Sequence, residues 1–164
     1  MSNNIDEITS KIKYWIENDR GSKYQITDNE SPYILKITTI ERNALPPIMV
    51  FKPDGYFDKI GIYTGIDFDD EQRKSFNGLT NEMKEKIMNE IINGISMMGL
   101  VIKIHPNKYN LQKIHLQEMI YFDGISKDRI MNAITKVLCG FVFIISVLEK
   151  YNITRPTFDP STLI

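Results

Sequence analysis

Residues 100–122 have the sequence LVIKIHPNKYNLQKIHLQEMIYF, and this stretch decides the fold class. It holds two apolar segments, Leu100–Ile104 and Ile114–Phe122, separated by a polar segment at 106–112. Apolar residues of the second segment alternate with other residues, which is the period of a strand with one buried face: Ile114, Leu116, Ile120 and Phe122. The stretch therefore predicts two antiparallel strands joined by a polar loop.

The two histidines of the chain lie in this hairpin. A turn that is symmetric about Asn110 pairs His105 with His115, Lys103 with Gln117, and Val101 with Met119. Two imidazoles across a strand pair are a start for a zinc site, which needs further ligands. Glu118 falls on the other face, and no other residue of the hairpin obviously supplies a third ligand. We therefore predict a solvent-facing pair and no metal, with His105 and His115 as weak candidates for metal ligands.

Helical patterns flank the hairpin on both sides. Upstream, apolar residues recur every three or four positions: Leu79, Met83, Ile87, Ile91, Ile95 and Met98. Thr80 or Asn81 is a suitable N-cap for this helix, and Gly99 is a suitable stop. Downstream, Ser126 is a suitable N-cap for a last helix that runs to about Tyr151.

The N-terminal half contributes one helix and a strand meander. Apolar spacing predicts a helix over Ile5–Ile16. Residues rich in β-branched and aromatic types predict four strands, beginning at Tyr24, Tyr33, Ile48 and Lys59, with turns at 28–32 and 53–55. The order α-β-β-β-β-α-β-β-α predicts an α+β fold in which helices pack on an antiparallel or mixed sheet. We expect a single domain over 1–153 and a C-terminal tail over 154–164.

The last helix contains an apolar run, Val137–Leu148. As a helix this run would measure about 18 Å, too short for the ~30 Å hydrocarbon core of a membrane. An exposed patch of this kind is rare on monomers, so either another part of this chain, such as the first helix with Trp15, or a second subunit must cover it. The candidate interface residues are Val137, Leu138, Phe141, Phe143, Ile144 and Val147.

Charge and cysteine content limit the functional classes. The net charge is −1, and basic residues alternate with acidic ones along most of the chain, which argues against a nucleic-acid binder. The single cysteine, Cys139, lies in the apolar run, which indicates a structural thiol in a reducing compartment. The polar N-terminus indicates that a signal peptide is absent. We expect a cytoplasmic protein that binds neither nucleic acid nor membrane.

Catalytic signatures are weak throughout. The acidic cluster over 67–71 lacks the glycine and glutamate that a calcium loop requires, and helix-start acids explain it better. The sequence has no nucleophile elbow, dinucleotide fingerprint or phosphate loop. Gly61 and Gly65 fall in or beside a strand and indicate a bulge or a close backbone contact. We predict no catalytic residue and no cofactor.

The element order resembles the fold of the type III secretion chaperones and their relatives. The segments Tyr33–Ile37, Ile48–Phe51 and Leu79–Met98 look like an uncharacterised archaeal protein family linked to that fold. The resemblance covers roughly Ile5–Tyr151 and is topological and compositional. It implies a homodimer that holds an extended segment of a client protein.

Two functional hypotheses follow. The first is a non-enzymatic, chaperone-like protein-binding module that acts as a homodimer on an unknown protein partner. Its candidate adaptable surface comprises Tyr33, Met49, Phe51, Tyr63, Met97 and Met98. The alternative is a small enzyme or a ligand or metal sensor with a pocket near the hairpin at 100–122. That pocket would use His105 and His115 with Tyr109 or Tyr121.

Overall fold

The computed structural model describes residues 2–18, 24–28, 33–39, 45–56 and 58–153. The predicted turn at 28–32 and the predicted tail at 154–164 fall largely or wholly outside these residues. The elements, in chain order, are α1 (Ser2–Glu17), β1 (Tyr24–Asp28), β2 (Tyr33–Thr39), β3 (Ile48–Phe51), β4 (Lys59–Asp67), α2 (Asp70–Asn77), α3 (Asn81–Met97), β5 (Val101–Asn107), β6 (Asn110–Tyr121), η1 (Phe122–Gly124) and α4 (Lys127–Lys150).

The strands form one six-stranded sheet in the order β1-β2-β3-β4-β6-β5, and every neighbouring pair is antiparallel. The predicted α+β class and the N-terminal meander are confirmed. Two helices, α2 and α3, stand between β4 and β5 where the sequence predicted one. The chain returns from α3 as β5 at the edge of the sheet, and β6 then fills the place beside β4.

The helix ends follow the predicted caps. The side chain of Thr80 accepts a hydrogen bond from the backbone N–H of Met83, and that of Ser126 accepts one from Arg129. Gly99 has a φ of 71° just after α3, a backbone conformation that glycine adopts without strain. Asp69 and Gln72 form a capping box at α2, which explains the acidic cluster as a helix start.

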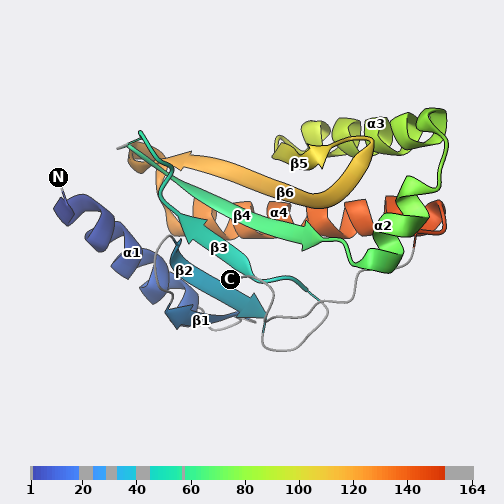
Figure 1. Cartoon of the computed structure of the whole chain (residues 1–164). Helices are drawn as coiled ribbons and strands as arrows, with labels where there is room; N and C mark the ends of the chain where they lie inside the picture. The colour runs from blue at the N-terminus through green and yellow to red at the C-terminus, as the bar shows by residue number, and fades with distance from the viewer. Residues whose placement is uncertain (1, 19–23, 29–32, 40–44, 57, 154–164) are drawn as a thin grey trace.

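One face of the sheet packs against α4, which runs behind β4 and β6 in Figure 1. Side chains of this inner face are at most 2% exposed: Ile60, Ile62, Thr64, Ile66, Ile114, Leu116 and Ile120. The Thr64 hydroxyl is buried but donates to the Pro47 carbonyl at 2.9 Å. Gly140 lets α4 approach closely, since a Cβ there would lie 2.8 Å from Cδ1 of Leu100.

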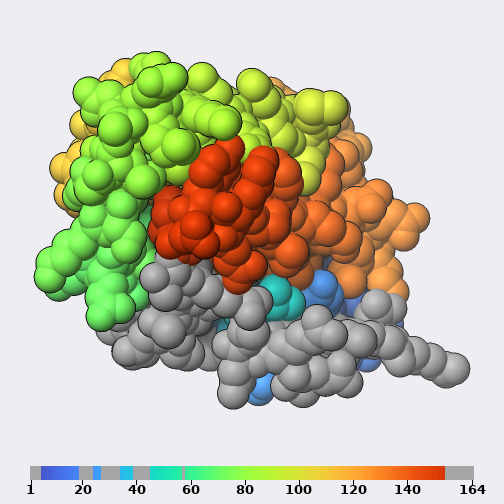
Figure 2. All heavy atoms as spheres, turned by 90° about the vertical axis from the view of Figure 1, so that its right-hand side faces the viewer, coloured from blue at the N-terminus to red at the C-terminus, as the bar shows by residue number. Residues whose placement is uncertain are grey.

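The apolar run of α4 is covered within the single chain, by the sheet, α3 and α1. Figure 2 shows α3 beside the C-terminal half of α4. Five of the six residues predicted as an interface are at most 9% exposed: Val137, Leu138, Phe141, Ile144 and Val147. The sixth, Phe143, is half-buried and its ring lies over Gly94 of α3. Of the two possibilities that the sequence left open, coverage by another part of the same chain therefore accounts for the apolar run.

Two expectations drawn from the apolar run alone, its length relative to a membrane and the setting of Cys139, differ from what the complete helix α4 shows. By length and composition α4 could cross a membrane, and 50% of its most apolar window is buried inside the fold. Cys139, which the sequence placed in the apolar run as a structural thiol, is exposed. Helical periodicity explains this, because Cys139 shares the outward side of α4 with Thr135, Val142 and Ser146.

The predicted register of the second hairpin is wrong by two residues. His105 lies opposite Lys113, and Lys103 lies opposite His115. The reason is a two-residue turn: Oδ1 of Asn107 accepts from the backbone N–H groups of Tyr109 and Asn110, at 2.9 and 3.1 Å. An irregularity between His105 and Pro106 accompanies it. Because side chains alternate with a period of two, both histidines stay on the predicted face.

Candidate functional site

The second face of the sheet is the candidate site, and we call it the outer face. It consists of the side chains that alternate with the buried ones on β3 to β6: Met49, Phe51, Lys59, Gly61, Tyr63, Gly65, Asp67, Val101, Lys103, His105, Lys113, His115, Gln117, Met119 and Tyr121. Most of these side chains are half-buried or exposed, whereas Met49 is 2% exposed. The described helices pack on the inner face and at the ends of the sheet.

Four rings form a continuous row across the outer face, which we call the ring row. Phe51 meets Tyr63 edge-on with centroids 5.6 Å apart, and Tyr63 meets His115 at 5.5 Å. His115 and His105 lie tilted with centroids 5.1 Å apart. The row crosses β3, β4, β6 and β5 in order, a width of about 14 Å at the usual strand spacing. Contacts of this geometry are favourable between aromatic rings.

Two glycines of β4 let the ring row lie flat on the strand. A Cβ at Gly61 would stand 2.1 Å from Cε1 of Phe51, and one at Gly65 would stand 3.1 Å from Cδ2 of His115. The pairing of β4 with β6 continues without a bulge through both positions. Of the two predicted explanations for these glycines, the close contact is therefore confirmed.

The histidine end of the row is surrounded by positive charge. Burial, and after it the charges of Lys113, His105 and Lys103, together lower the pKa of His115 from 6.5 to about 4, against the opposing carboxylate of Asp67. Nζ of Lys113 pairs with Oδ1 of Asp67 at 2.9 Å. At pH 7 the imidazole of His115 is therefore neutral, with one donor and one acceptor nitrogen.

The structure brings His105 and His115 together but separates the two tyrosines of the sensor hypothesis from them. The hydroxyl of Tyr109 donates to Glu85 of α3. Tyr121 is six residues from His115 along β6, a distance of about 20 Å at the usual rise of a strand. Its ring centroid lies 5.2 Å from Nζ of Lys59. Among the described residues no group of three or more histidine, cysteine, aspartate and glutamate side chains could hold a metal ion.

Strand β5 lies at one edge of the sheet, and among the described strands its one neighbour is β6. Val101, Lys103 and His105 are exposed there, and Val101 is 48% exposed. An edge strand presents unpaired backbone N–H and C=O groups on its free side. The edge therefore lies directly beside the histidine end of the ring row. Met97, at the end of α3 just before β5, is 90% exposed.

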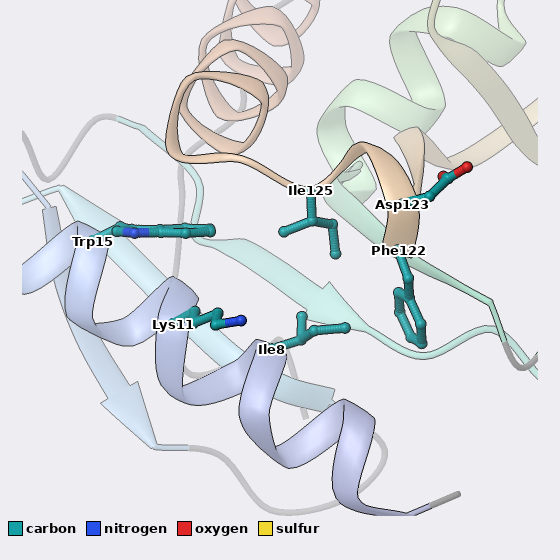
Figure 3. Close-up of a pocket in the computed structure, with 6 residues that line it drawn as sticks. All are labelled: Ile8, Lys11, Trp15, Phe122, Asp123 and Ile125. Atoms are coloured by element: carbon teal, nitrogen blue, oxygen red, sulfur yellow. The ribbon is translucent and has the colours of Figure 1, made fainter.

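A separate hollow of about 420 Å³ lies between α1 and η1. Its lining consists of Ile8, Lys11, Trp15, Phe122, Asp123 and Ile125. In Figure 3 Ile8 and Lys11 point from α1 towards the side of Ile125 and Phe122, while Asp123 points away from α1. Nζ of Lys11 pairs with Glu7 at 2.6 Å. No pattern in the sequence indicates this hollow, because its two halves are more than a hundred positions apart.

Comparisons with known proteins identify relatives of the same fold. A family model described as "Uncharacterized conserved protein (DUF2299)" matches residues 8–148. No curated protein matches the chain. An uncharacterized protein from Methanothermobacter thermautotrophicus has 17% identity and a TM-score of 0.71, over 88% of this chain and 99% of that one. YbjN from E. coli has 7% identity and a TM-score of 0.51, over 91% and 96%. At these identities the two structures show the fold alone.

Proposed function

The chain belongs to the DUF2299 family, and from this premise we propose that it is a non-enzymatic protein-binding module. In the proposal, the outer face and the free edge of β5 hold an extended segment of a partner protein, in a chaperone-like manner. The observation that carries the proposal is the ring row, which adjoins β5, the edge strand of the described sheet.

The edge supplies affinity that is independent of the partner's sequence. An extended segment that adds to β5 forms backbone hydrogen bonds along Val101–His105, as in other cases of strand addition. Pro106 has no backbone N–H, so the usable edge ends there. Alternate side chains of the added segment would then lie next to Val101, Lys103 and His105 on the outer face.

The ring row supplies anchoring contacts. Phe51, Tyr63 and His115 are half-buried, so each keeps an accessible surface while its orientation is fixed by neighbouring rings and strands. Aromatic side chains on rigid elements lose little conformational freedom on binding, and they contribute strongly to interfaces.

A homodimer and a cytoplasmic location are further parts of this proposal. The support for a dimer through α4 is narrower than the sequence indicated, because of the six candidate side chains only Phe143 keeps a half-exposed surface. Val142, which was not among them, is 53% exposed on the outward side of the helix. A homodimer that forms through the β5 edge, and not through α4, would leave the core undisturbed.

Selection from a phage-displayed library of random twelve-residue peptides tests the proposal for a partner of any sequence. We expect selected peptides to bind the full chain, to protect amides of β5 from hydrogen exchange, and to lose affinity with Tyr63→Ala. Tyr14→Ala is the matched control, since Tyr14 is 64% exposed on α1. A failure to select any peptide, or equal sensitivity to both substitutions, would contradict the proposal.

The second candidate function is a ligand or metal sensor near the hairpin. One observation favours it, namely the 5.1 Å separation of the ring centroids of His105 and His115. Titration with Zn²⁺, followed by NMR of both imidazoles, tests this candidate. Saturable binding that His115→Gln abolishes would favour the sensor; unchanged imidazole signals at millimolar Zn²⁺ would dismiss it.

A further inference from the structure

We propose that the partner segment is acidic, with at least one carboxylate two residues away from an apolar side chain, and that it adds to β5 as a strand. This inference rests on the proposed function and specifies the chemistry of the partner. It is carried by the distribution of charge over the two faces of the sheet and by the order of side chains along β5.

Charge on the described strands is strongly asymmetric. On the outer face the side chains that carry a full charge are Lys59, Lys103, Lys113 and Asp67, and Lys36 of β2 extends this face by its pairing with Met49. The whole chain has 20 basic and 21 acidic residues, so a face with four lysines and one aspartate departs clearly from the average. The carboxylate of Glu118, on β6, lies on the inner face, 5% exposed, where Arg129 and Lys136 of α4 neutralise it.

The lysine nearest the edge lacks an acidic partner within the described part of the chain. Lys103 is exposed on β5, and among the described residues no carboxylate pairs with it. Several other lysines are paired, for example Lys108 with Glu85 at 3.2 Å and Lys150 with Glu90 at 2.8 Å. Lys113, beside Lys103, is partly neutralised by Asp67. A carboxylate brought next to Lys103 would therefore form an ion pair that the described residues do not supply.

The order of side chains along β5 defines a pattern for the partner. Val101, Lys103 and His105 face outward at alternate positions, about 7 Å apart along the strand. An added strand places its own alternate side chains next to these three. An apolar residue next to Val101 and a carboxylate next to Lys103 complement them, and a second acceptor next to His105 extends the match. The partner pattern is thus apolar-x-acidic.

The experiment uses the peptides selected against the full chain at low salt. We expect enriched sequences to carry Asp or Glu two residues from an apolar residue, and replacement of that acid by Gln to weaken binding about tenfold or more. Lys103→Gln should cause a similar loss, and the two losses should not add, because they remove the same ion pair. Lys74→Gln on α2 is the matched control and should change nothing. Raising the salt should reduce the preference for the acid.

The outcomes separate this inference from the proposed function. Selected peptides that depend on Tyr63 but lack carboxylates, or that ignore Lys103→Gln, would overturn the inference and leave the protein-binding role in place. A failure to select any peptide would contradict the role, and the inference would fall with it. A 15-residue single-stranded oligothymidylate that displaces the peptide and depends on Lys103 would overturn the inference in favour of a nucleic-acid ligand. Circular dichroism of each variant verifies that the fold is retained.

Discussion

Two residues without side chains give the outer face its shape. Gly61 and Gly65 lie two strand positions either side of Tyr63, and they leave the space that the rings of Phe51 and His115 occupy. A methyl group at Gly61 would displace the ring of Phe51, whereas one at Gly65 would require the ring of His115 to shift by a few tenths of an ångström. The ring row therefore depends on the two glycines of β4 as well as on the aromatic residues themselves.

Gly61→Ala should destabilise the protein by about 1–3 kcal/mol, the usual range for inserting a methyl group into a packed site. The new Cβ would stand 2.1 Å from the ring of Phe51. In a Phe51→Ala background the same change should cost much less, since the clashing ring is gone. Urea unfolding of the four proteins measures this coupling. Gly124→Ala is the control, because a Cβ there meets nothing within 4 Å; additive effects of the two substitutions would contradict the packing.

His115 should make stability depend on pH. Its pKa is lowered in the folded chain to about 4, chiefly by burial and then by Lys113, His105 and Lys103, with Asp67 opposing. Between about pH 6.5 and pH 4 the unfolded chain binds more protons at this residue than the folded chain, so stability falls as the pH falls through this window. Urea unfolding should show this slope, and His115→Gln should reduce it. An NMR titration of His115 with a midpoint near 6.5 would contradict the burial.

Among the elements, the β5–β6 hairpin shows how far sequence reasoning reaches. Alternation of apolar residues predicted the strands, their faces and the shared face of the two histidines, because a strand period of two is a local property. The register depends instead on one side chain: Asn107 closes the turn by accepting two backbone hydrogen bonds. A polar stretch with several turn-forming residues allows more than one such closure. The register predicted from the sequence was therefore wrong by two positions.

Helix α4 shows a second limit of sequence reasoning. Its apolar run predicted burial but left two coverings open, since composition does not identify the neighbour. The neighbour is settled by tertiary contacts such as Phe143 on Gly94, whose residues are far apart in the sequence. The hollow beside Trp15 was missed for the same reason, because α1 and η1 meet only in three dimensions.

Phe143→Glu should destabilise the fold of the single chain instead of separating subunits. The ring of Phe143 lies over Gly94, where a Cβ would stand only 2.3 Å from it, so a carboxylate at this position would be placed between two helices. Loss of the packing and partial burial of a charge should lower the free energy of unfolding by about 2–4 kcal/mol. Thermal unfolding measures the effect. The neighbouring exposed residue provides the control: Val142→Glu should change stability by about 0.5 kcal/mol or less. Equal effects would contradict the assigned sides of α4.

At the scale of the whole molecule, the two faces of the sheet carry different kinds of side chain. The inner face carries the apolar core and the α4 helix, and it neutralises its buried carboxylate, that of Glu118, with two cations. The outer face carries rings and lysines, and it extends to β5, the edge strand of the described sheet. Such a division lets the outer face vary in side chains without loss of the core, because residues at alternate strand positions serve different faces.

The oligomeric state tests whether α4, which covers the inner face of the sheet, also forms a contact between subunits. Because five of the six α4 candidates are buried inside one chain, we expect Val142→Glu, on the exposed side of α4, to leave the solution mass unchanged at micromolar concentration. Light scattering on a sizing column measures the mass, which is 19.1 kDa for a single chain. A dimer that Val142→Glu converts to single chains without loss of helix content would restore α4 as the interface. A dimer that survives this change but dissociates when a selected peptide is added would place the subunit contact at β5, because one strand edge cannot pair with two strands at once.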